Sequence, residues 1–68
     1  MSYRNNVQVG HVVEIIRKNR DDQQGLQIIG QVTGVAEDYV DPDMLRVMIA
    51  GLGEWLRLDD NTVIERLA

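Results

Sequence analysis

The chain has few residues that could perform chemistry, and the first to consider is its single histidine, His11. General acid–base or nucleophilic catalysis needs two or three titratable groups that converge in one cleft. His11 stands between Gly10 and Val12, in a stretch that is typical of a β-strand, and the sequence marks no catalytic partner for it. We therefore interpret His11 as a surface or strand-edge residue and expect that the protein is not an enzyme.

Four acidic residues, Glu37, Asp38, Asp41 and Asp43, are candidate oxygen ligands for a hard cation. Their spacing does not match an EF-hand loop, because no glutamate follows at the required distance. The absence of cysteine and the single histidine also exclude the usual ligand sets of zinc. We interpret the four acids as a solvent-exposed turn around Pro42, and we predict no metal site and no cofactor.

A basic cluster, Arg17, Lys18 and Arg20, precedes Asp21 and Asp22 in a polar segment. One interpretation is a flexible, soluble loop whose charge is nearly cancelled by the two aspartates, because isolated surface charges contribute little to stability. The other is a docking site for an acidic partner or a phosphate. The sequence leaves both interpretations open.

The best candidate for recognition is the only tryptophan, Trp55, together with Arg57, Arg46 and Met48. Side chains alternate between the two faces of a strand, so these four residues are expected on one face, opposite Leu56. Tryptophan and arginine are enriched in the energetically dominant parts of interfaces. The alternatives are that Trp55 covers an open end of the fold, or that a one-residue register shift places it in the core.

Length and charge set the limits for these sites. The 68 residues make one domain, which buries only about 60% of its unfolded surface. Eleven acidic and seven basic residues give a net charge of −4, whereas a phosphate-binding protein usually carries a basic stripe. No apolar run is long enough to cross a bilayer, residues 1–8 lack a signal-peptide core, and disulfides are impossible, so we expect a cytoplasmic protein.

Hydrophobic alternation and β-branched content predict five strands, over residues 7–17, 26–36, 45–50, 55–58 and 63–67. Residues 18–25 form a polar loop, the Asp-Pro-Asp segment at 41–43 a turn, and Gly51-Leu52-Gly53 a hairpin connection. Residues 59–62 suit a single helical turn. This order predicts a small five-stranded SH3-like barrel over residues 7–68, after a flexible N-terminus at 1–6. A C-terminal helix over residues 60–68 is the alternative to the last strand.

Two details of these strands depend on glycine. Gly30 and Gly34 lie four residues apart in the second predicted strand, which favours the strong coiling that a small barrel needs. Strict alternation along this strand would place Ala36 on the same face as Val32, and Val35 on the opposite face. Gly10 in the first strand predicts a bulge or bend.

Two stretches carry a family resemblance: Val9-Gly10-His11-Val12-Val13-Glu14-Ile15-Ile16-Arg17 and Trp55-Leu56-Arg57-Leu58-Asp59. The first resembles the opening strand, and the second is similar to the closing strands, of the small SH3-like accessory subunits of cyanobacterial and chloroplast photosynthetic complexes. The resemblance implies a stromal or cytoplasmic protein without a cofactor, which tunes the docking or assembly of a larger complex. Members that assist acidic electron carriers present more basic residues than this acidic chain.

The leading functional hypothesis is therefore a non-enzymatic protein-interaction module, an accessory or regulatory subunit that docks on a larger complex. A nucleic-acid-binding barrel is the first alternative, with Trp55, Arg46 and Arg57 against the bases and backbone, although the net acidity opposes it. A phage-encoded acidic inhibitor that imitates nucleic acid is the second, based on the acids at positions 37–43 and 59–60.

Overall fold

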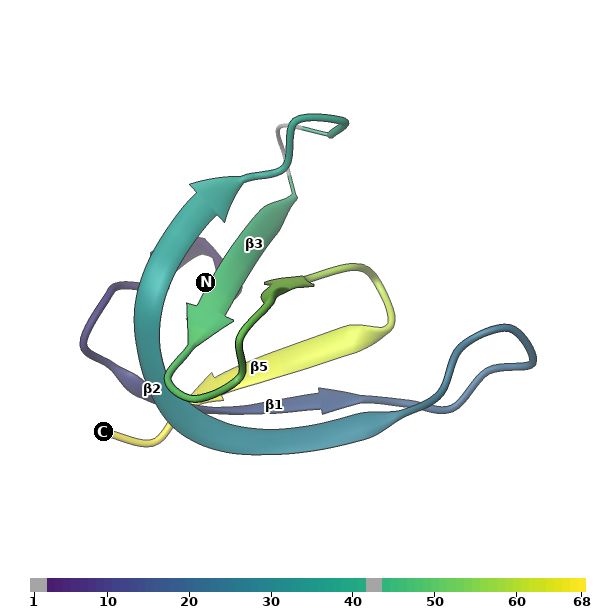
Figure 1. Ribbon diagram of the computed structural model, residues 1–68, viewed down its shortest axis with the longest axis horizontal. Helices are drawn as coiled ribbons and strands as arrows, with labels where there is room; N and C mark the ends of the chain where they lie inside the picture. The colour runs from purple at the N-terminus through teal and green to yellow at the C-terminus, as the bar shows by residue number, and fades with distance from the viewer. Residues whose placement is uncertain (1–2, 42–43) are drawn as a thin grey trace.

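The structure is a computed structural model that describes residues 3–41 and 44–68. It contains a 3-10 helix, η1 (Tyr3–Asn6), and five strands: β1 (Val12–Arg17), β2 (Leu26–Glu37), β3 (Leu45–Ile49), β4 (Trp55–Arg57) and β5 (Thr62–Arg66). All strand pairs are antiparallel, and the order across the sheet is β4-β3-β2-β1-β5 (Figure 1). The predicted all-β architecture of five strands is confirmed, as is a strand rather than a helix at the C-terminal end.

Two finer predictions are not confirmed. The sheet has β4 and β5 at its two edges and is not closed into a barrel, although the long strand β2 bends strongly and brings the two halves of the sheet to face each other (Figure 1). Residues 59–62 do not form a helical turn. They form a hydrogen-bonded turn in which the Asp59 carboxylate accepts bonds from the Asn61 backbone N–H (2.9 Å) and the Thr62 hydroxyl (2.8 Å). The Thr62 backbone N–H also donates to the Asp59 carbonyl at 3.1 Å, which closes a single β-turn.

The core lies on the concave side of the bent sheet. Its fully buried members come from all parts of the fold and include Val13, Ile15, Val32, Val47 and Leu58. Each such side chain contributes about 1.5–3 kcal/mol when it leaves water. In the described part of the chain, no helix is long and apolar enough to cross a membrane.

The first strand begins later than the sequence predicts. Gly10 has a φ of +100° and lies in a turn, so β1 starts at Val12 rather than Val7. Glycine adopts this backbone region without the steric penalty of a side chain. Val7 is nevertheless buried, whereas Val9 is exposed. His11 lies at the strand edge, half-buried, and its Nδ1 is 2.8 Å from the hydroxyl of Tyr3.

The alternation expected along β2 is wrong beyond Val32. The register of β2 against β3 shifts between Val32 and Gly34, which is a β-bulge. After it, Val35 pairs with Val47 and turns to the core side, whereas Ala36 turns to the convex face. A bulge adds one residue to one strand, so every later side chain changes face.

The N-terminal residues contact the sheet. η1 packs against β5, and the Arg4 guanidinium donates hydrogen bonds to the carbonyls of Asp59 and Thr62. Thr62 is the first residue of the edge strand β5, so one of these bonds occupies a backbone acceptor at the end of that strand and the other an acceptor in the preceding turn. The flexibility expected of residues 1–6 stays a prediction, and residues 1 and 2 lie outside the described part.

A candidate interaction surface on strands β3 and β4

The pairing of β3 with β4 brings four of the predicted site residues together on the convex face. Arg46 stands opposite Arg57, and Met48 stands opposite Trp55. Between these pairs, Val47 stands opposite Leu56, and both of those side chains are buried in the core. Because alternate residues of a strand point to opposite faces, the two arginines, Met48 and Trp55 share the outer surface.

Trp55 lies on this surface and not in the core, which excludes the alternative of a one-residue register shift. It is 43% exposed. Its ring lies across the sheet over Gly34 of β2, where a β-carbon would come within 3.0 Å of the indole Cη2 atom and 3.4 Å of the Met48 Cβ atom. The missing side chain at Gly34 therefore lets the indole lie close to the β2 backbone, while 43% of the residue stays exposed.

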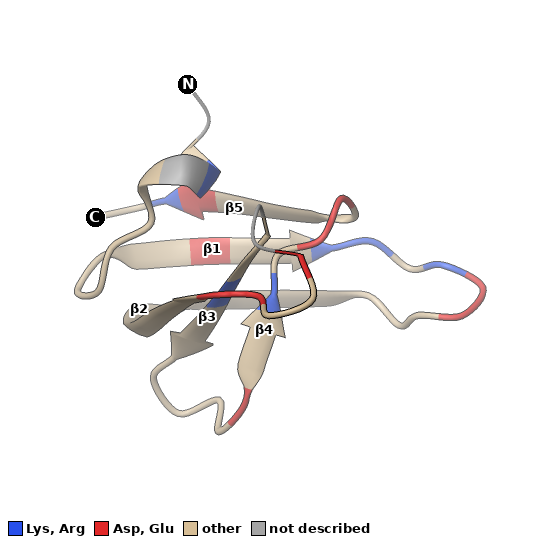
Figure 2. Cartoon of the chain, turned by 90° about the horizontal axis from the view of Figure 1, so that it is seen from above, with Lys and Arg blue, Asp and Glu red and all other residues tan. Residues whose placement is uncertain are grey.

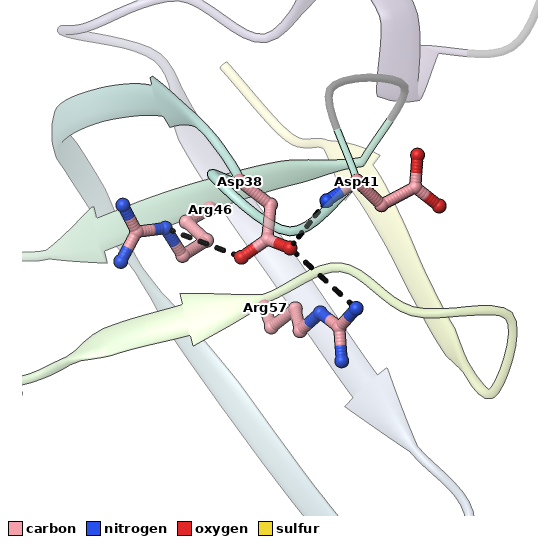
Figure 3. Close-up of polar contacts among 4 residues, drawn as sticks. All are labelled: Asp38, Asp41, Arg46 and Arg57. Carbon is pink, nitrogen blue, oxygen red and sulfur yellow. Dashed lines mark hydrogen bonds and ion pairs between the residues drawn. The ribbon is translucent and has the colours of Figure 1, made fainter.

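Asp38 corrects the interpretation of the acidic turn as uniformly solvent-exposed. It follows directly after β2 and is only 5% exposed. Its carboxylate lies between the two arginines: Oδ1 is 3.7 Å from Arg46 Nε, and Oδ2 is 3.5 Å from Arg57 Nη2 (Figure 3). The backbone N–H of Asp41 also donates to Oδ2, at 3.1 Å. Two like charges directly opposite each other destabilise a sheet, and Asp38 supplies the counter-ion that holds this pair together.

Arg46 is the centre of the surface. Its guanidinium carbon is 4.8 Å from the ring centroid of Tyr39 and 5.7 Å from that of Trp55. Both distances are within the range of cation–π attraction. Its Nε atom is buried and has no hydrogen-bond partner among the described residues, because Asp38 faces it beyond hydrogen-bond distance. Tyr39 itself is 84% exposed, so its ring is accessible to a partner while it contacts Arg46.

We call Tyr39, Arg46, Met48, Trp55 and Arg57 the arginine–aromatic surface. Two guanidinium groups and the one carboxylate of Asp38 leave one net positive charge. The described residues enclose no pocket and hold no group of three or more potential metal ligands among their acidic and histidine side chains. Chemically, this surface is a cationic and aromatic contact area whose two arginines are held in place by Asp38.

The basic cluster at Arg17, Lys18 and Arg20 lies elsewhere. It begins where β1 ends and follows the long β1–β2 hairpin, which projects from the sheet and carries Asp21 and Asp22 at its tip (Figure 2). The hairpin is closed by the paired backbones of Arg20 and Gln23, and the Arg17 Nε atom donates to the Gln24 carbonyl at 3.1 Å. The predicted basic residues therefore divide into two separate groups.

Comparison with protein-family models, with curated protein sequences and with solved structures finds no match to this chain.

Proposed function

We propose that this chain is a non-enzymatic protein-interaction module with an SH3-like barrel fold, and that it docks on a larger complex as an accessory or regulatory subunit. The observation that carries the proposal is the Arg46 guanidinium, which lies between Tyr39 and Trp55 with Asp38 behind it. Tryptophan, tyrosine and arginine are the residues that most often dominate binding energy. The resemblance to the accessory subunits of photosynthetic complexes agrees with this role.

The electrostatics favour an acidic partner on the arginine–aromatic surface. Arg57 keeps half of its side chain exposed, and Asp38 neutralises only one of the two guanidinium groups. Arginine pairs with carboxylates through parallel hydrogen bonds, which gives orientation as well as attraction. Because the arginines are already held by Asp38, less conformational entropy is lost when a partner binds them.

The test is affinity capture from the native cell extract, treated with nuclease, using the wild-type protein and three variants. Trp55→Ala and Arg57→Gln change the arginine–aromatic surface, and Gln24→Ala is the matched control in the distant hairpin. We expect a stoichiometric protein partner that the control retains and both surface variants lose. Retention of the same partner by Trp55→Ala, with the fold intact by circular dichroism, would remove this surface from the proposal.

Nucleic-acid binding is the second candidate, favoured by the exposed Tyr39 ring beside Arg46. Bases stack on exposed aromatic rings in proteins that bind single strands. An affinity for single-stranded RNA that falls steeply with salt and depends on Tyr39 would favour it over a protein partner. The observations favour a phage-encoded acidic inhibitor less. Asp38 is buried and paired with two arginines, so fewer acidic charges remain on the surface to imitate a phosphate backbone.

A further inference from the structure

The other half of the convex face, on strands β5, β1 and β2, carries the opposite charge. Strands β5, β1 and β2 present Glu14, Ile16, Ile29, Val63 and Glu65 on their convex side, which we call the acidic–apolar surface. In the register, Glu14 stands opposite both Ile29 and Glu65, and Ile16 stands opposite Val63. Ile16 is 40% exposed, Ile29 62% and Val63 53%. Ile16 and Val63 are direct cross-strand neighbours and Ile29 is diagonal to Ile16, so the three exposed side chains form one group, of the kind from which apolar contact sites are built.

Within residues 3–41 and 44–68, the two glutamates have no counter-ion. Glu14 and Glu65 are direct cross-strand neighbours (Figure 2), and like charges in this position destabilise a sheet. Glu14 accepts one hydrogen bond, from the Gln27 side chain at 2.9 Å, and neither glutamate forms an ion pair with any described residue. The neighbouring base, Arg66, stands opposite the buried Val13, and strand alternation therefore directs it to the other face.

We propose that the acidic–apolar surface is a second docking site, whose occupant is a protein segment that combines basic and apolar side chains. Cations from the partner would supply the charge that the Glu14–Glu65 pair lacks, and its apolar side chains would cover Ile16, Ile29 and Val63. The site is independent of the arginine–aromatic surface and of the function proposed for it. Together the two surfaces would let one small domain join an acidic partner to a basic one.

The charge of this surface argues against three other occupants: a symmetric contact with a second copy, nucleic acid and an anionic membrane. A symmetric contact between two copies brings the same surface of each copy into one interface, so the four carboxylates of two Glu14–Glu65 pairs would lie in it. Nucleic acid and anionic membrane surfaces are themselves negative, and would be repelled by the same pair. A cationic protein segment satisfies the charge and the apolar area at once.

The experiment is a titration of the isotope-labelled whole chain with a short peptide of alternating lysine and valine, followed by NMR. A peptide of alternating lysine and glycine has the same charge without the apolar side chains and is the probe control. We expect saturable shifts at Ile16, Ile29 and Val63 with the valine peptide, and much weaker binding of the glycine peptide. Shifts that map to Trp55 and Arg46, equal binding of the two peptides, or no saturable binding would overturn the proposal.

Two variants separate a docking role from a structural one. Glu65→Gln removes half of the like-charge pair, so it should weaken peptide binding by about two- to five-fold, which is the range of an exposed ion pair. It should leave the melting temperature unchanged or higher, because cross-strand repulsion is lost. Arg57→Gln, on the other surface, should leave peptide binding unchanged. A Glu65→Gln protein that melts at a lower temperature and binds the peptide as before would show a purely structural residue.

Whole-protein sedimentation over a range of concentrations completes the test. We expect the wild-type chain to show no self-association through this face. If the chain self-associates, and Val63→Thr or Glu65→Gln changes that association, the occupant is a second copy and the proposal is wrong.

Discussion

The indole of Trp55 lies directly over Gly34, and a methyl group at that glycine would come within 3.0 Å of it. We expect Gly34→Ala to displace the ring and to expose it more to water, with a shift of tryptophan fluorescence to longer wavelength. Trp55 is the only tryptophan, so the emission reports this site alone. Gly53→Ala is not a useful control, because Gly53 has a φ of +82°; Gln31→Ala on the convex face of β2 is the better one. Unchanged emission would contradict the close packing.

A side chain added at Gly30 would crowd the core and not Trp55, so we expect its effect on stability. A β-carbon there would come within 2.6 Å of the Cγ2 atom of Ile49, which is buried in the core. Crowding of a packed core costs about 1–3 kcal/mol, so Gly30→Ala should lower the free energy of unfolding by about that amount in a urea titration. The exposed substitution Gln24→Ala, in the β1–β2 hairpin, should change it by less than about 0.5 kcal/mol. Equal stabilities would show that Ile49 moves aside freely.

Asp38→Asn leaves Arg46 and Arg57 opposite each other without their counter-ion. We expect a loss of about 1–3 kcal/mol in the free energy of unfolding, the usual cost of leaving a buried polar or charged group unsatisfied. The loss should be smaller at high salt, where the repulsion between the arginines is screened. Glu37→Gln, one residue earlier and exposed, is the matched control. If both variants unfold at the same urea concentration, Asp38 does not hold the arginine pair.

The loss of folding stability at low pH should depend in part on the Asp59 carboxyl. Burial raises the pKa of this carboxyl. The hydrogen bonds from the Thr62 hydroxyl and the Asn61 N–H lower it, as do Gln23 and the charge of Arg17. Together these outweigh burial, so the pKa lies below the ordinary 3.8. The folded-state pKa is thus below that of the unfolded chain. The carboxylate therefore stabilises the fold above about pH 3.8, and this contribution is lost as the pH falls through the folded-state pKa.

Thr62→Val tests this dependence, because it removes the hydroxyl that donates to Asp59 at 2.8 Å. The pKa of Asp59 should rise in an NMR titration of the carboxyl carbon, and the free energy of unfolding at neutral pH should fall by about 1 kcal/mol. The control is Asp60→Asn, which changes the neighbouring exposed carboxyl and leaves the Thr62 bond in place. An Asp59 titration curve unchanged by Thr62→Val would show that this hydrogen bond does not set its pKa.

Local sequence was sufficient to predict the five strands. Val13, Ile15, Val47 and Leu56 alternate with polar or exposed residues, and this period of two predicts both the strand and the face that each residue takes. The same period predicted that Arg46, Met48, Trp55 and Arg57 share a face. Two arginines on one face also indicate a need for a counter-ion, but Asp41, Asp43 and Glu54 lie nearer to one or both of them in the sequence than Asp38, so only the fold selects Asp38.

Tertiary structure decided the features that depend on how strands pair. The bulge after Val32 turned Val35 to the core, because an inserted residue reverses the alternation and its position depends on the partner strand. The burial of Asp38, and the placement of Glu14 opposite Glu65, likewise follow from register between segments far apart in the chain. Hydrophobic period is a property of one strand, whereas register and burial are properties of strand pairs. The sequence by itself therefore determined that five segments form strands and which side chains alternate within them, whereas only the fold decided the faces beyond the bulge and which charges meet.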